Sequence, residues 1–143
     1  MKRFESLLRL LPAVPLLFAS CSGSAGQRPL RLVVLDPGHF HASLLQKNAL
    51  AELSDTVRVY APEGEEVEQY LAAVASYNGR AEEPTSWREV VYTGPDYLER
   101  MVGERAGDLV VLAGNNRKKT GYILASVKAG YHVSVSYTHL RAH

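Results

Sequence analysis

Apolar residues recur along the chain with two different periods, and the two periods alternate. Short apolar or alternating runs, as expected of β-strands, occupy residues 30–35, 56–60, 89–92, 108–113 and 131–133. Between them, apolar residues recur at helical spacing in residues 41–53, 67–77, 95–105 and 118–129. The order of strand and helix, repeated through residue 133, predicts an α/β fold with a doubly wound parallel sheet.

The turns that follow the predicted strands are the places where function is expected. The turn after the first strand reads Asp-Pro-Gly, the turn after the second reads Pro-Glu-Gly, and both interrupt regular structure. Gly130 closes the last helix, where a residue in the left-handed conformation is needed. In open parallel sheets, ligands bind beyond the carboxyl ends of the strands. We therefore expect a ligand near the turns after Leu35, Tyr60 and Ala113.

The first 29 residues lack this alternation and have the pattern of an export signal. A positively charged start precedes a mostly apolar stretch at residues 7–19, which is too short to span a bilayer. Small residues then precede Cys21, as in a bacterial lipobox. We predict a lipoprotein signal peptide at residues 1–20, lipidation of Cys21, and a flexible tether at residues 21–29. A plain secretory signal is the alternative. In both cases the protein is exported, and lipidation would make it a periplasmic or outer-membrane-associated lipoprotein anchored to a membrane.

The end of the chain also departs from the alternation. Residues 134–143 show neither a helical nor a strand period, and they include the string Val-Ser-Tyr-Thr-His-Leu-Arg-Ala-His. This string resembles translated sequencing-adapter read-through, so we interpret residues 134–143 as an artefactual tail. The alternative is a genuine disordered tail. The domain is accordingly expected over residues 30–133, with a sheet that is incomplete at its C-terminal end.

Composition narrows the classes of function. The length of 143 residues fits a single domain of modest size. The formal net charge is +1, from 16 Lys and Arg against 15 Asp and Glu, so no basic surface is expected to bind nucleic acid. The single cysteine excludes an internal disulfide and the zinc sites that need several cysteines. Metal sites built from histidine and carboxylate stay open, but none is assigned.

The segment from Asp108 to Val133 resembles part of a known oxidoreductase domain. Its sequence, DLVVLAGNNRKKTGYILASVKAGYHV, is similar to the fourth strand, following helix and fifth strand of the Gfo/Idh/MocA family. That family has a Thr-Pro-Asn turn, and the resemblance places Gly114, Asn115 and Asn116 at its three positions. It implies a Rossmann-like domain that binds NAD or NADP. It also implies hydride transfer to or from a sugar or polyol in the full-length enzyme.

The turn after the first strand departs from the family's Gly-x-Gly-x-x-Gly pattern. Its three glycine positions hold Asp36, Gly38 and His41, so that only the second is a glycine. Asp36 would place a negative charge beside a pyrophosphate. The start of the following helix still offers amide donors, and His41 adds a proton-dependent contact. The cofactor-binding residues implied in this turn are Gly38, His39, Phe40 and His41, although the two histidines have an equal reading as ordinary turn residues.

Two further positions bear on the cofactor and on activity. The acidic residue that usually holds the adenosine ribose would lie near residue 61, and Glu63 is the available substitute, which leaves NAD and NADP open. Lys118 and Lys119 are expected to be a solvated helix start rather than phosphate ligands. The family's catalytic lysine would follow Val133, where the tail begins, and the substrate domain is missing. No catalytic residue is therefore assigned, and the chain by itself is expected to be inactive.

Two other functions remain open. The string Val-Val-Leu-Asp-Pro-Gly-His at residues 33–39 also resembles the strand and zinc-histidine turn of periplasmic N-acetylmuramoyl-L-alanine amidases, a class of zinc hydrolases. That match stops at His39, because the later ligands have no clear counterparts. The second alternative is a non-catalytic sugar-binding lipoprotein that kept the nucleotide-binding fold after losing its glycines.

Overall fold

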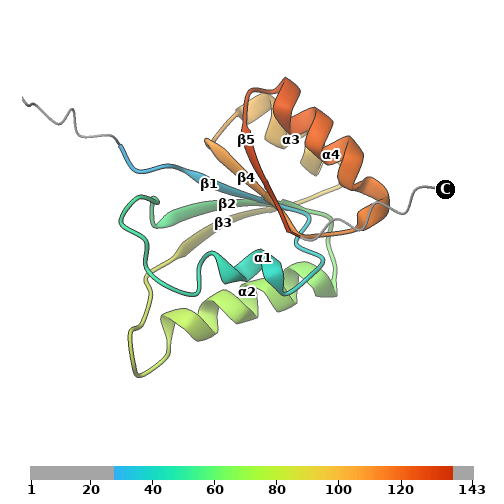
Figure 1. Ribbon diagram of the computed structural model, residues 1–143. Helices are drawn as coiled ribbons and strands as arrows, with labels where there is room; N and C mark the ends of the chain where they lie inside the picture. The colour runs from blue at the N-terminus through green and yellow to red at the C-terminus, as the bar shows by residue number, and fades with distance from the viewer. Residues whose placement is uncertain (1–27, 137–143) are drawn as a thin grey trace, which may run out of the picture.

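The computed structural model describes residues 28–136, which form a parallel sheet with helices on both faces. The strands are β1 (Leu32–Leu35), β2 (Thr56–Ala61), β3 (Arg88–Thr93), β4 (Leu109–Leu112) and β5 (His132–Val135). The helices are α1 (His41–Leu44), α2 (Glu65–Asn78), α3 (Tyr97–Glu104) and α4 (Asn116–Lys128). Figure 1 shows α1 and α2 on one face of the sheet and α3 and α4 on the other. The predicted doubly wound parallel sheet is confirmed.

The order of the strands determines where a ligand site can form. The sheet runs β3-β2-β1-β4-β5, and all four pairings are parallel. From β1, the chain first adds strands on one side and then crosses over to add β4 and β5 on the other side. The turns after β1 and β4 therefore lead away from the sheet toward opposite faces. The space between such turns is the usual ligand-binding position in sheets of this topology.

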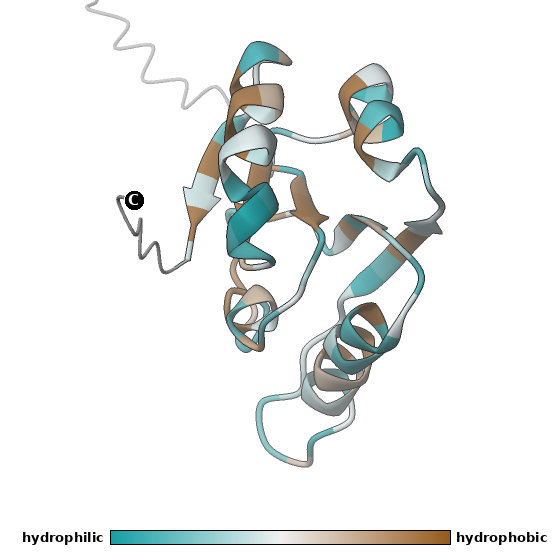
Figure 2. Cartoon of the chain, turned by 90° about the vertical axis from the view of Figure 1, so that its right-hand side faces the viewer, coloured by the Kyte–Doolittle hydropathy of each residue, from teal (hydrophilic) through white to brown (hydrophobic). Residues whose placement is uncertain are grey.

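Two apolar cores, one on each face, hold the sheet between the helices. Successive side chains of β1 point to opposite faces, so Leu32 and Val34 pack with Val74 of α2, while Val33 lies in the second core with Met101 of α3. All five side chains are almost fully buried. The same two-sided burial explains why β4 is apolar without alternation. Figure 2 shows mostly apolar residues in the central strands and a mixture of apolar and hydrophilic residues along the helices.

The first helix is much shorter than predicted. The apolar spacing predicted a helix over residues 41–53, but α1 ends at Leu44. The cause is Gln46, whose amide donates to the Ser43 carbonyl three residues back and whose own carbonyl accepts from the Trp87 indole at 2.6 Å. The Gln46 side chain is also buried and donates to Glu89 at 2.8 Å. These contacts with distant residues replace the next helical hydrogen bonds.

The fifth strand is longer than predicted. β5 continues through Val135, past the predicted end at residue 133, and Ser134 pairs with Val111 of β4. The amide of Ser136 also donates to the carbonyl of Leu112 at 2.9 Å. Pairing at a sheet edge uses backbone groups, so it does not need the alternating side-chain pattern that these residues lack. The interpretation of residues 134–143 as an artefactual tail stays a prediction.

The other predicted elements are present, with ends that differ by a few residues. Gly130 has a φ of 82°, as its predicted position after the last helix requires. The predicted signal peptide, Cys21 and most of the tether lie outside the described residues, as do residues 137–143. Within residues 28–136, no helix is both long enough and apolar enough to cross a membrane.

Candidate functional site

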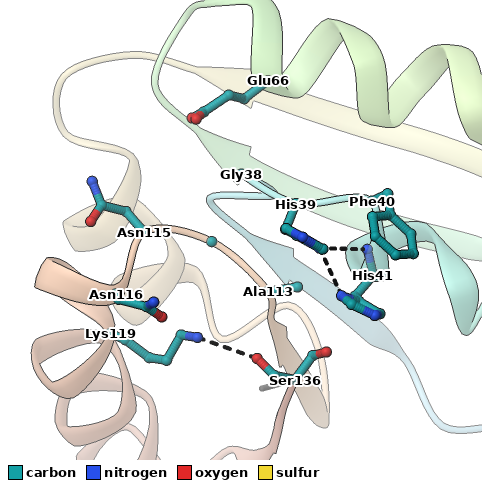
Figure 3. Close-up of a pocket in the computed structure, with 11 residues that line it drawn as sticks. Gly38, His39, Phe40, His41, Glu66, Ala113, Asn115, Asn116, Lys119 and Ser136 are labelled. Carbon is teal, nitrogen blue, oxygen red and sulfur yellow. Dashed lines mark hydrogen bonds between the residues drawn. The ribbon is translucent and has the colours of Figure 1, made fainter. Parts of the chain in front are cut away.

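A cavity of about 520 Å³ lies at the carboxyl ends of β1 and β4, where the direction of strand addition reverses. Its walls are the turn after β1, the turn after β4, the start of α4, and single residues from α2 and the end of β5 (Figure 3). The lining residues are Gly38, His39, Phe40, His41, Glu66, Ala113, Gly114, Asn115, Asn116, Lys119 and Ser136. The structure thus brings together every cofactor-binding residue expected from the sequence except Glu63.

The floor of the cavity is formed by two turns whose backbones touch. A Cβ atom added to Gly114 would lie 2.0 Å from the carbonyl oxygen of Asp36, a distance that no side chain tolerates. A Cβ atom on Gly38 would lie 3.3 Å from the Cα of Gly114. Glycine at position 114 therefore permits the close approach of the two turns. At Gly38 and Gly114 the two turns present backbone rather than side chains to the cavity, which suits a bulky ligand that binds to main-chain groups.

Asp36 does not present its carboxylate to this cavity. Its side chain is buried, and its Oδ2 accepts a hydrogen bond from the hydroxyl of Tyr122 at 2.6 Å. Asp36 also has a φ of 48°, a left-handed conformation that glycine would adopt without strain. At the position of the fingerprint's first glycine, the chain thus keeps the glycine-like backbone but adds an anchored side chain. Asp36 is not among the residues that line the large cavity.

One wall of the cavity is a cluster of three rings. His39 and His41 stack with their ring centroids 4.5 Å apart, and Phe40 lies against both. The Nδ1 atoms of the two histidines are 2.7 Å apart, so one ring donates a hydrogen bond to the other. Phe40 remains 66% exposed, and its ring is available to stack with a planar ligand group. Because α1 has only four residues, its amino end carries a smaller partial charge than the predicted helix over residues 41–53 would have.

The opposite wall is the start of α4, a helix of 13 residues. The Asn115 side chain caps it by accepting from the amide of Arg117 at 2.9 Å, and Asn116 is its first residue. The amino end of a helix of this length carries a partial positive charge. Asparagine and backbone amides at this position offer donors to a ligand with anionic or amide groups.

Lys119 also belongs to this wall, contrary to the expectation of a solvated helix start. Only 7% of the residue is exposed, and its Nζ donates to the carbonyl of Ser136 at 3.2 Å (Figure 3). One turn later, Tyr122 and then Ser126 are buried on the same helix. The spacing of residues 119, 122 and 126 is that of one helical face, so this signal was present in the sequence. Lys118, by contrast, is exposed as expected.

Two of the acidic residues that follow β2 lie in different places. Glu63 is exposed and borders a smaller cavity with Pro62 and Gly64, and it does not line the large one. Glu66, which the sequence analysis did not single out, lines both cavities from the first turn of α2. A Cβ atom added to Gly38 would lie 3.4 Å from Oε2 of Glu66. Glu66, rather than Glu63, is therefore the carboxylate that lies beside Gly38 and lines the large cavity.

The histidines of the cavity do not form part of a recognisable metal centre. Within the described part of the chain, no group of three or more histidine, cysteine, aspartate or glutamate residues is placed to hold a metal ion. The zinc hydrolase interpretation gains no support from residues 28–136.

One comparison with known proteins is informative. No family model and no curated protein matches the chain. A solved structure does match, namely that of a "putative oxidoreductase" from Parabacteroides merdae ATCC 43184, with 48% sequence identity and a TM-score of 0.76. The match covers 76% of this chain and 25% of that protein, so the chain matches only about a quarter of the length of the solved oxidoreductase. The described residues thus form a Rossmann-like α/β fold similar to part of that protein.

Proposed function

We propose that residues 28–136 bind a nicotinamide dinucleotide, NAD or NADP, in the cavity between β1 and β4, as part of an oxidoreductase. The observation that carries the proposal is the contact between the turns of Gly38 and Gly114. This contact keeps side chains out of the place where a pyrophosphate would lie in a fold of this kind. The likeness to a solved protein described as an oxidoreductase supports the same function.

The residues of the cavity offer the groups that such a cofactor needs. The backbones of Gly38 and Gly114 would hold the pyrophosphate, with the amino end of α4 and the ammonium group of Lys119 on the positive side. The carboxylate of Glu66 would accept hydrogen bonds from ribose hydroxyls. The rings around Phe40 would stack with a base or with nicotinamide. When bound, the cofactor supplies hydride transfer, and the chain's own residues orient it and limit its contact with water.

The proposed substrate class, the export and the lipid anchor rest on the amino-acid sequence. The resemblance of residues 108–133 to the Gfo/Idh/MocA family supports a sugar or polyol as the substrate. The pattern around Cys21 supports export and a lipid anchor. Proton transfer and substrate binding are not assigned to any residue between 28 and 136, so we expect the chain to bind the cofactor but not to oxidise a sugar.

A fluorescence titration tests the proposal. Adding the full chain to NADH, and separately to NADPH, is expected to change the nicotinamide emission to a saturating value for at least one of them. An excess of the matching oxidised cofactor should reverse the change, because both forms occupy the same cavity. A signal that rises in proportion to protein without saturating, for both cofactors, would contradict the proposed function.

A further inference from the structure

A chain of hydrogen bonds connects α4 to the turn after β1 on the face of the sheet covered by α3 and α4. Lys118 donates from its Nζ to the hydroxyl of Tyr97 at 3.2 Å. The hydroxyls of Tyr97 and Tyr122 are 2.5 Å apart, and Tyr122 donates to Oδ2 of Asp36 at 2.6 Å. Each hydroxyl has one proton, and Tyr122 uses its proton in the hydrogen bond to the carboxylate. Tyr97 therefore donates to Tyr122, and the chain has one direction, from the ammonium group to the carboxylate.

The end of this chain at Asp36 is buried and conformationally unfavourable. Asp36 is 4% exposed and Tyr122 is 5% exposed, so water cannot replace the bond between them. The positive φ of Asp36 is disfavoured for residues with a side chain. Burial, together with the hydrogen bonds to Asp36 and Tyr97, raises the pKa of Tyr122 well above its usual value, so Tyr122 remains a donor.

The backbone of Asp36 touches both turns of the cavity floor. Its carbonyl oxygen accepts from the amide of Gly38 at 2.8 Å, and the same oxygen limits how closely Gly114 can approach. A shift of Asp36 would therefore move both glycines. The side chain of Asp36 leaves the turn in the direction of Tyr122, so the bond between these two residues restrains the turn from the far side of the sheet.

We infer that Asp36 and Tyr122 are positioning residues, whose hydrogen bond fixes the turn after β1 in the shape that the cofactor cavity requires. A glycine at this position would supply the backbone conformation alone. In this chain the conformation is less favourable, and the anchored carboxylate compensates for it. The consequence for ligand binding rests on the proposed function, whereas the consequence for the shape of the turn does not.

The first test compares two variants of the hydrogen bond between Tyr122 and Asp36. One removes the donor, and the other keeps an acceptor. Tyr122→Phe is expected to weaken NADH binding by about tenfold or more, because the turn loses its restraint and the buried Asp36 loses its partner. Asp36→Asn is the conservative variant, since asparagine tolerates a positive φ and its side-chain oxygen still accepts from Tyr122. It should keep the affinity within about threefold of the wild-type value, a small change on the scale of one hydrogen bond. A loss with Asp36→Asn as large as that with Tyr122→Phe would overturn the inference.

The second test separates positioning from general destabilisation. In the Asp36→Gly background, adding Tyr122→Phe should produce no further loss of NADH affinity, because the bond is already absent and glycine adopts the turn freely. An equal loss from Tyr122→Phe in both backgrounds would show that Tyr122 acts independently of Asp36.

The shape of the turn is measured without any ligand. In ¹H–¹⁵N NMR spectra, Tyr122→Phe is expected to shift the amide signals of Gly38 and Gly114, while that of Gly103 at the end of α3 stays in place. If wild-type protein binds neither NADH nor NADPH, the proposed function fails and these spectra alone decide the inference. Unchanged signals for both Gly38 and Gly114 would overturn it.

Discussion

Replacement of Gly114 by valine is expected to abolish cofactor binding and to lower the free energy of unfolding by about 3 kcal/mol or more. The Cβ atom would lie 2.0 Å from the backbone oxygen of Asp36, and a backbone atom cannot move aside by rotating a side chain. The turns after β1 and β4 would have to separate, and the floor of the cavity would be lost. Urea unfolding measures the first effect, and NADH titration of the folded variant measures the second.

Gly121 offers a control position for the contact made by Gly114. It lies within α4, and a Cβ atom there would meet no atom within 4 Å. Gly121→Ala is therefore expected to raise the free energy of unfolding by about 0.5–1 kcal/mol, through helix propensity, and to leave NADH binding unchanged. If Gly114→Val also left stability and binding unchanged, the contact between the two turns would not exist as described.

The second large effect is expected at Lys119. Lys119→Met keeps much of the buried apolar volume but removes the ammonium group from the wall of the cavity. Loss of a charged hydrogen bond to the cofactor costs about 1.5–3 kcal/mol, so the Kd for NADH should rise roughly 10- to 150-fold. Isothermal titration calorimetry measures this Kd directly.

The control for Lys119 lies at the other end of the same helix. Lys128 is exposed in the last turn of α4, so Lys128→Met removes the same charge without touching the cavity. It is expected to change the Kd by less than about twofold, since distant exposed charges are screened by salt. Equal effects of the two substitutions would mean that Lys119 acts through net charge and not by contact.

The layered fold was predictable because its signals are local. Each strand and helix carries its own apolar period, and the glycine after α4 marks a turn by its own backbone preference. The end of α1 was not predictable in this way. The apolar spacing continues past Leu44, and the helix stops because Gln46 bonds with Trp87 and Glu89, which are more than 40 residues away in sequence.

The site was predictable to the extent that the topology determines it. Parallel strands place their carboxyl ends at one edge, so the turns containing Gly38 and Gly114 had to lie near each other. Glu66 and the end of β5 reach the cavity only through packing, which no local pattern reports. Lys119 was assigned to solvent because of its charge, although its spacing with the buried Tyr122 placed it on the inner face of α4.

The cofactor site is tested most directly by a ¹H–¹⁵N NMR titration of the full chain with NAD and, in parallel, with NADP. One of them is expected to cause saturable shifts, largest for the amides of Gly38, His39, Gly114 and Asn115. The amide signal of Gly107, which lies before the amino end of β4 and so at the opposite end of the strands, should not shift. The absence of shifts with both cofactors, or shifts concentrated around Gly107, would contradict the assignment of this cavity as a cofactor site.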